Sequence, residues 1–441
     1  MRLVDRFVTR LAALRPGTGP LLVAVSGGLD SVVLLDLLVR TRARHGLTLI
    51  VAHVDHGIHP ESAEVARQVE SLAAALGVSC VVGRLRLGPV VSETRARTAR
   101  YRWLRETRRR LGARWIVTAH QADDQRETVL MRLLRGSGPA GLAGIRPRDR
   151  GVLRPLLPFS RQSLARYARG RGLRWWEDPA NGDPRHLRSW IRTALLPAVE
   201  TRLPDVGRKL NQTRRHARQA CRSWDSALRS WPGLDVTVGR FETSLSWPAL
   251  QELPADLAAA LVEALIRAAH GPVSPTRIRR ALNALRGGQS GARADLGRGW
   301  SITLAFGRLR AEPPSRRVAE PPRTIEHLTG EASWGPWKVR WATEPAPARQ
   351  QRDGRTAWFI PGMLAVRGWR RGDRLAPLGG RGHRLAVRCF QDARVPLSQR
   401  RSWPMIEAEG RLAWIPGVCR SGRLLPTAGS PALRIDVERR G

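Results

Sequence analysis

Short apolar runs alternate with longer amphipathic stretches through the first third of the chain. Four apolar runs have the length and flanking residues of buried strands, and they cover residues 21–25, 47–54, 78–82 and 115–119. The stretches that follow them have the period of helices, and they cover residues 32–39, 61–76, 92–111 and 123–134. Repeated strand–helix units with short connections predict a doubly wound parallel sheet, that is, a Rossmann-like α/β fold.

The pattern changes beyond this domain. Residues 160–230 and 255–288 have helical periodicity, and strand-like pieces follow near residues 300–306. After about residue 335, short runs separated by Gly, Pro and Trp are typical of a small, mostly β module. We therefore expect four parts: an α/β domain at residues 1–205, a helical or α+β middle domain at 206–312, a proline-rich linker at 313–335 and a mostly β C-terminal module at 336–441.

The chain is strongly basic. It carries 76 basic and 37 acidic residues among 441, a formal charge of +39. Such an excess predicts a polyanionic partner, most simply a nucleic acid. Lysine occurs only at Lys209 and Lys338, so a genome that favours arginine codons is an alternative source of the many arginines. That bias explains arginine in place of lysine but not the excess over acids.

Cysteine usage and hydropathy exclude several classes of protein. Cys80, Cys221, Cys389 and Cys419 lie far apart with no CxxC pair, which argues against a zinc ribbon, a cysteine-ligated iron–sulfur cluster and a disulfide scaffold. No apolar run approaches the roughly 18–20 residues that span a membrane. The residues before the first strand read as a short amphipathic helix. We expect a cytoplasmic protein with reduced thiols that does not associate with membranes.

A glycine-containing loop links the first strand to the first long helix. Its residues are Ser26, Gly27, Gly28, Leu29, Asp30 and Ser31. Small residues allow backbone N–H groups to approach phosphate, and the helix N-terminus adds positive potential. The loop lacks the spacing of a Walker A motif and of a GxGxxG dinucleotide fingerprint. It predicts a different kind of nucleotide site, although a simple strand-to-helix turn is the alternative.

Polar segments also follow the second and fourth strands. Residues 53–57 (HVDHG) begin where the second strand ends, and residues 118–128 (TAHQADDQRET) where the fourth ends. In a doubly wound sheet, ligands bind at the carboxyl ends of the strands. The three segments therefore predict one shared site.

The loop and the motifs after it resemble known enzymes. Residues 26–31 (SGGLDS) resemble the pyrophosphatase loop of the PP-loop ATPases, which cleave ATP between the α and β phosphates. The full ordered set is similar to that of the tRNA(Ile)-lysidine synthetase family, and beside the segments above it comprises residues 96–101 (ARTARY), 135–138 (RGSG), 154–157 (RPLL), 178–181 (DPAN), 188–192 (RSWIR), 366–374 (VRGWRRGDR) and 414–417 (WIPG). The resemblance covers nearly the whole chain and is weakest over residues 205–330.

The resemblance implies an activity. Members join the ε-amino group of free L-lysine to C2 of the cytidine at the first position of the CAU anticodon of tRNA(Ile). ATP first adenylates the base, and lysine then displaces AMP, so that the tRNA reads AUA in place of AUG. The implied cofactors are ATP and Mg²⁺, and the implied partner is this tRNA. No protein partner is evident, and the chain alone leaves a homodimer open.

The residue types fit that chemistry independently. A bare carboxylate does not favour phosphate, so Asp30 is expected to hold a Mg²⁺ ion that bridges phosphates; a helix cap is the alternative. Arg97 and Arg100 share a helix face, where one could meet the α-phosphate or the adenylated base while the other pairs with Glu93. The alternative for this pair is a solvated basic face, because the same helix carries several other arginines.

Acidic and histidine side chains are expected around the same site. Asp123, Asp124 and Glu127 could bind the lysine ammonium group or Mg²⁺, or accept a proton from the attacking amine; capping of the helix N-terminus is the alternative. His120 is expected to contact the nucleotide or the base. His53 and His56 are expected to contact adenosine, with structural histidines as an equal alternative.

Two groups of arginines are expected to contact tRNA. Arg188 and Arg192 are four apart on one helix face, and we expect phosphate contacts there. Ser189 departs from the family pattern, which usually has Asn after the first Arg, and this puts one hydrogen bond in doubt. In the C-terminal module, Arg367, Arg371 and Arg374 accompany a tryptophan, a set that can combine phosphate contact with base stacking. A β surface with genome-biased arginine is the alternative.

Two rival functions can be weighed from the sequence. A tRNA thiolase with the same ATP loop would need a sulfur-carrying cysteine or cluster ligands, whereas Cys80 falls within an expected strand. A basic RNA-binding protein with an inactive ATP loop would not need the intact segment 26–31 or Asp124. Both rivals are disfavoured by these residues.

Overall fold

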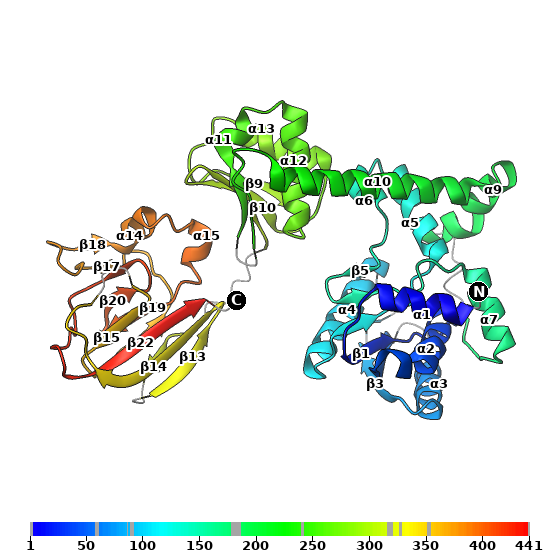
Figure 1. The fold of residues 1–441 in the computed structure, drawn as a ribbon, viewed down its shortest axis with the longest axis horizontal. Coiled ribbons are helices and arrows are strands. Elements are labelled where there is room, and N and C mark those ends of the chain that lie inside the picture. The colour runs from blue at the N-terminus through cyan, green and yellow to red at the C-terminus, as the bar shows by residue number, and fades with distance from the viewer. Residues whose placement is uncertain are drawn as a thin grey trace. The chain divides into compact units, whose positions relative to one another are not determined.

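The structure is a computed structural model that describes residues 3–57, 61–85, 87–88, 92–177, 187–239, 242–314, 321–325, 329–350 and 354–439. It divides into two compact units, residues 1–222 and 223–441 (Figure 1). None of the described helices combines the length and apolar character needed to cross a bilayer.

The first unit contains the expected parallel sheet. Its strands are β1 (Gly19–Ala24), β2 (Leu47–Asp55), β3 (Ser79–Arg84), β4 (Trp115–Val117), β5 (Arg148–Asp149) and β6 (Val152–Leu153). They lie in the order β3-β2-β1-β4-β6-β5, and all neighbours are parallel except β5 and β6. The crossover between β3 and β4 places β1 at the centre, which is the point where strand order reverses and ligands bind in such folds.

Helices cover both faces of this sheet (Figure 1). The helices up to the fifth are α1 (Leu3–Ala13), α2 (Leu29–Thr41), a 3₁₀ turn η1 (Ala43–His45), α3 (Ser62–Ala75), α4 (Glu93–Arg110) and α5 (Ala122–Leu134). Along β1, Leu21 and Val23 belong to the core with α1, α2 and α3, whereas Leu22 belongs to the core with α4. This alternation follows from the two-residue period of a strand and confirms the α/β class.

The expected element boundaries hold to within a few residues, with one difference at the loop. We expected the helix to start at residue 32, after Asp30 and Ser31, but α2 starts at Leu29 with Gly28 as its N-cap. Asp30 and Ser31 therefore lie in the first helical turn, because Gly28 already has extended backbone angles and closes the loop before them.

The remainder of the first unit is helical. It comprises α6 (Pro139–Leu142), α7 (Arg161–Gly170), α8 (Leu187–Trp190), the π-helical turn η3 (Ile191–Leu195), α9 (Leu196–Arg202) and α10 (Val206–Ser230). Helix α10 starts at the expected boundary near residue 205 and runs without interruption across the division between the two units. The expected domain boundary at residue 205 thus marks a helix start and not the end of a compact unit.

The second unit begins with an antiparallel sheet and three helices. The sheet has the order β7-β8-β11-β10-β9, with β7 (Thr237–Val238), β8 (Thr243–Ser246), β9 (Arg293–Gly297), β10 (Trp300–Ala305) and β11 (Arg308–Glu312). It shares an apolar core with α11 (Trp247–Gln251), α12 (Ala255–Ala268) and α13 (Pro275–Leu285).

The C-terminal part is mostly β, as expected. One sheet has the order β12-β16-β19-β20-β21, with β12 (Arg323–Ile325), β16 (Leu364–Arg367), β19 (Met405–Ala408), β20 (Arg411–Ile415) and β21 (Cys419–Arg420). A second has the order β13-β14-β22-β15, with β13 (Thr329–Trp334), β14 (Trp337–Pro345), β15 (Thr356–Phe359) and β22 (Pro431–Arg439). The pair β17 (Arg374–Leu375) and β18 (Arg384–Leu385) and helices α14 (Ala386–Asp392) and α15 (Leu397–Arg400) complete it.

One expected boundary needs correction. Residues 323–325 and 329–334 were expected within the proline-rich linker, but they form β12 and β13, which pair with β16 and β14. Pro321 and Pro322 immediately precede β12. Proline is tolerated there because a residue before the strand does not have to donate an N–H to the neighbouring strand. Residues 315–320 and 326–328 lie outside the described residues.

Candidate active site

A cavity of about 610 Å³ opens at the carboxyl ends of β1, β2 and β4. The predicted site residues that line it are Ser26, Gly28, Leu29, Asp30, Ser31, Arg97, Arg100, His120, Asp124, Arg188 and Arg192. The three polar segments that the sequence places after separate strands thus meet in one site, because parallel strands end at the same edge of the sheet.

The loop after β1 is held in a tight turn by its own side chains. The Ser31 hydroxyl donates to the carbonyl oxygen of Gly28 (2.8 Å) and accepts from the backbone N–H of Ser26 (3.2 Å). Gly27 has φ of +88°, and a Cβ atom there would lie 2.8 Å from the Val65 side chain. The loop therefore needs glycine at position 27, and it leaves the N-terminus of α2 facing the cavity, where an anion is favoured.

Asp30 lies at this helix N-terminus with one carboxylate oxygen buried and without a hydrogen-bond partner. Burial raises the pKa of Asp30 to about 6, against the opposing effect of Arg161. A buried oxygen without a partner is costly, so the geometry favours a cation or a donor at this point when the site is loaded.

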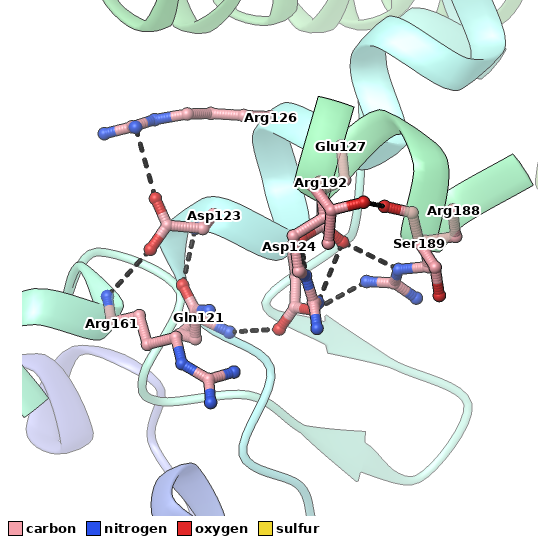
Figure 2. Close-up of polar contacts among 10 residues, drawn as sticks. Gln121, Asp123, Asp124, Arg126, Glu127, Arg161, Arg188, Ser189 and Arg192 are labelled. Atoms are coloured by element: carbon pink, nitrogen blue, oxygen red, sulfur yellow. Dashed lines mark hydrogen bonds and ion pairs between the residues drawn. The ribbon is translucent and has the colours of Figure 1, made fainter. Parts of the chain in front are cut away.

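The start of α5 is built by a reciprocal cap (Figure 2). The Gln121 side chain accepts from the Asp123 N–H (2.5 Å), and the Asp124 carboxylate accepts from the Gln121 N–H (2.8 Å). Asp124 is thereby fixed at the cavity wall by one of its two oxygens. The capping alternative is confirmed for this oxygen, and the second oxygen of the carboxylate is not used in the cap.

That second oxygen enters an ion-pair network (Figure 2). Arg188 contacts Asp124 (2.6 Å) and Glu127 (2.8 Å), and Arg192 contacts Glu127 (2.5 Å) and, more distantly, Asp124 (3.7 Å). The Glu127 side chain is only 2% exposed, so both guanidinium groups compensate a buried charge. Burial raises the pKa of Asp124, while Arg188 opposes the shift.

The network changes the interpretation of Arg188 and Arg192. We expected both to contact tRNA phosphates from one helix face, and the structure places them in the cavity wall with carboxylate partners. The π-helical turn η3 begins between them, and such turns occur often at functional sites. Ser189, the departure from the family pattern, lines the same cavity.

Two further expected site residues point elsewhere. The Asp123 carboxylate accepts from the backbone N–H of Arg161 (2.8 Å) and pairs with Arg126 (3.2 Å), so it fixes the start of α7 (Figure 2). His53 is 4% exposed and its Nδ1 lies 2.9 Å from the Val25 carbonyl oxygen. Neither belongs to the cavity lining. Strand alternation explains the histidine, because positions 52, 54 and 56 line the cavity and position 53 points away from it.

The histidines that do line the cavity are uncharged near neutral pH. Burial and the neighbouring Arg154 lower the pKa of His120 well below its usual range, and its Nδ1 lies 2.9 Å from the Thr118 hydroxyl. Burial and Arg100 lower the pKa of His56 to about 4. Neutral imidazoles can accept as well as donate hydrogen bonds, which suits contact with a base or a ribose.

Arg97 and Arg100 reach the cavity from α4. Their guanidinium carbons lie 5.4 Å and 5.6 Å from the centre of the Tyr101 ring. One aromatic side chain thus positions both, and both can meet the same ligand. The side chain of Glu93, expected to pair with one of them, lies outside the described residues, as does the segment 178–181.

Sequence reasoning missed two contributors to this cavity. Arg161 follows the short strand β6, which was not recognised as a strand, so its place at a carboxyl end was hidden. Trp176 lines the cavity, and its backbone N–H donates to the Gly27 carbonyl oxygen (3.0 Å). The adjacent Trp175 packs partly against the core and also lines the cavity.

The expected RNA contacts in the C-terminal part divide into two kinds. Arg371 and Arg374 are exposed. Arg367 is 4% exposed, and its guanidinium group bonds to Asp373 (2.8 Å) and to Glu407. A direct phosphate contact from Arg367 is therefore a wrong expectation, because both faces of its fork are already occupied. It instead fixes the turn at residues 368–373 that presents its exposed neighbours.

The described residues fit a magnesium–nucleotide complex better than a metal site built from protein ligands alone. Among them there is no group of three or more His, Cys, Asp or Glu side chains that could hold a metal ion. Mg²⁺ in nucleotide sites commonly takes one or two carboxylates and completes its shell with phosphates and water. The unpartnered oxygen of Asp30 beside the loop is a donor of that kind.

Known families and proteins match this chain over most of its length. A model described as a PP-loop domain matches residues 4–199, and one described as the TilS substrate C-terminal domain matches residues 364–437. The chain is 34% identical to the tRNA(Ile)-lysidine synthase of Symbiobacterium thermophilum, over 100% of this chain and 98% of that protein. It is 33% identical to the synthase of Methylococcus capsulatus (92% and 93% covered) and 34% identical to that of Azoarcus sp. strain BH72 (93% and 90% covered).

The fold and the loop define a PP-loop protein of the kind that uses ATP. Identity above 30% with whole-length coverage, and a match to the C-terminal domain as well, carry the assignment further. The chain belongs to the tRNA(Ile)-lysidine synthase family.

Proposed function

We propose that this chain uses ATP to ligate free L-lysine to C2 of cytidine 34 in the CAU anticodon of tRNA(Ile). The observation that carries the proposal is the single cavity in which the loop at residues 26–31 faces the carboxylates and guanidinium groups of α5 and α8. A phosphate-binding loop alone would support any ATP-cleaving reaction. Asp124 and Glu127 pair with Arg188 and Arg192. The carboxylates suit the ammonium group of lysine, and the guanidinium groups suit phosphate.

The first step forms a bond between cytidine O2 and the α-phosphorus and breaks the bond to pyrophosphate. The N-terminus of α2 and the loop N–H groups hold the phosphates. Asp30 would hold Mg²⁺, which would neutralise the phosphate charge as a Lewis acid. Arg192 lines the same cavity as Asp30, so its guanidinium group can meet the same phosphates when it leaves Glu127.

The second step forms the bond between the lysine ε-nitrogen and C2 and releases AMP. The incoming ammonium group must first lose a proton. Asp124 suits that role because burial raises its pKa, which makes it a stronger base than an ordinary carboxylate. Arg97 or Arg100 can stabilise the departing AMP phosphate from the opposite wall. We propose that Arg371 and Arg374 contact the tRNA backbone, and that the enzyme works in the cytoplasm.

Incubation with ATP, labelled lysine and unmodified CAU tRNA tests the proposal. We expect label in the tRNA, together with AMP and pyrophosphate. Asp30→Ala should lose pyrophosphate release and keep tRNA binding, which separates catalysis from binding. No incorporation of lysine by intact protein that binds this tRNA would refute the proposal.

A tRNA thiolase is the rival that shares the loop. Cys80 lies in β3, and burial raises its pKa to about 11, so its thiol stays protonated and is a poor sulfur nucleophile. Transfer of sulfur to the tRNA in the same assay, with a sulfide donor added in place of lysine, would favour the rival.

A further inference from the structure

A second cavity in the first unit is strongly basic. It has a volume of about 780 Å³ and lies between helices α1, α5, α7 and α10. Seven arginines and no acidic residue line it among the described residues, and six of them are Arg6, Arg10, Arg166, Arg208, Arg214 and Arg218. It shares no lining residue with the candidate active site, since the two cavities use different sides of α5.

Most of this charge is not compensated within the fold. Arg126, the seventh arginine, pairs with Asp123 (3.2 Å), and Arg208 pairs with Asp205 (2.5 Å). In the described part of the chain, the other five have no carboxylate partner. Five cations that share one cavity repel each other, so stability of the fold does not explain their convergence.

The surroundings of these arginines are prepared for an anion. Arg10 has a buried Nε atom with no hydrogen-bond partner. Arg6 stacks over the Phe159 ring at 5.1 Å, and Arg214 is oriented by the Asn211 side-chain oxygen (2.7 Å). Burial and mutual repulsion lower the pKa of Arg214 and Arg218. Guanidinium groups held in place lose little entropy when they bind phosphate through two hydrogen bonds.

The length of the cavity favours a chain of phosphates over a single small anion. Its lining residues on α10 run from Gly207 to Arg218. That stretch of helix corresponds to about 16 Å at roughly 1.5 Å per residue. That length exceeds the size of a single phosphate group, so more than one phosphate of a nucleic-acid strand fits along it. Among the described residues that line the cavity, Phe159 is the one aromatic side chain, and Arg6 already covers its ring. The cavity therefore favours contact with the RNA backbone over base stacking.

We propose that this cavity binds the phosphodiester backbone of the RNA substrate at a segment distant in sequence from the nucleotide held in the active site. Identification of that RNA as a tRNA rests on the function proposed above. The contact is independent of base sequence, so it contributes affinity and orientation and leaves base recognition to other surfaces.

The test compares two double variants of the same helix. Arg214→Gln with Arg218→Gln removes two cavity arginines. Arg215→Gln with Arg222→Gln is the matched control, because both are exposed on α10 and neither lines the cavity. Binding of unmodified CAU tRNA is measured by fluorescence anisotropy between about 50 and about 200 mM salt, and lysine incorporation is measured at varied tRNA concentration.

Loss of two phosphate contacts should flatten the plot of log affinity against log salt by about 1.4 to 1.8. Over the fourfold rise in salt, the tRNA affinity of the parent should therefore fall about 7- to 12-fold more than that of the cavity variant. We expect a higher KM for tRNA with kcat unchanged in the cavity variant, and a smaller change in the control. Equal slopes for the two variants would overturn the proposal. So would a raised KM for ATP with unchanged tRNA affinity, which would indicate a small-anion site.

A separate variant guards against misfolding. Arg166 is exposed on α7, at another wall of the cavity, and Arg166→Gln should reduce the slope by about 0.7 to 0.9. If the parent binds tRNA with a slope that the cavity variant reduces but incorporates no lysine, the proposed function fails and the cavity proposal stands. If the parent incorporates lysine and neither cavity variant changes the slope, the cavity proposal alone fails.

Discussion

Replacement of Asp30 by asparagine tests the assignment of this residue as a ligand-binding carboxylate and not a stabilising one. The buried, unpartnered oxygen makes the charged form of Asp30 unfavourable in the unliganded fold. The pKa rises from 3.8 to about 6, and at about 1.36 kcal/mol per unit this corresponds to a cost of about 3 kcal/mol. Asp30→Asn keeps the shape of the side chain and removes the charge that is costly to bury.

The pH dependence has a definite sign. Below about pH 4 the carboxyl group is protonated in both folded and unfolded chains, and the two proteins should be similarly stable. Between about pH 4 and pH 6 the folded protein retains a proton that the unfolded chain has lost, so the parent loses stability as pH rises through this window. Above about pH 6 the difference should be constant.

Thermal unfolding of the full chain measures this effect. At pH 8 we expect Asp30→Asn to raise the midpoint of the first unit by about 6–12 °C, since 1 kcal/mol shifts a domain of this size by about 2–4 °C. Addition of ATP and Mg²⁺ should stabilise the parent and not the variant. Glu106→Gln, which removes one exposed charge from the same unit, is the control. A variant less stable than the parent at pH 8 would refute the reasoning, because Asp30 would then stabilise the fold by itself.

Three further changes probe the loop, the imidazole and the C-terminal part. Gly27→Ala places a methyl group at φ of +88° and 2.8 Å from Val65, so we expect at least tenfold loss of ATP-dependent pyrophosphate release with tRNA binding retained; parental turnover would show that the loop is not restricted there. His120 should show no NMR titration between pH 6 and 8, because burial keeps it neutral, and a midpoint near 6.5 would contradict this. Arg367→Ala leaves Asp373 without its partner and should cost about 3–5 kcal/mol of stability in the C-terminal part, measured by denaturant unfolding; an unchanged midpoint would indicate an expendable pair.

Sequence pattern alone predicted the α/β class, the succession of strands along the chain and the meeting of three polar segments. The apolar runs at residues 21–25, 47–54 and 115–119 contribute side chains to the cores on both faces of the sheet. Strands that are buried on both faces need such continuous apolar runs. Their carboxyl ends must lie at one edge, so a site there follows from connectivity alone. The six-residue loop and the ordered motifs were sufficient to identify the family, because each is contiguous in sequence.

Tertiary structure decided which side chain of each segment faces the ligand. Asp123 and Asp124 are neighbours, yet one fixes α7 and the other lines the cavity, since a helix turns by about 100° per residue. Arg188 and Arg192 were recognised as a pair on one helix face, but their ion pairs with Glu127 were not predicted, because Glu127 lies far away in the sequence and no local pattern reveals the pairing. The basic cavity between α1, α5, α7 and α10 was equally hidden, since its arginines are scattered from residue 6 to residue 218 and only packing brings them together.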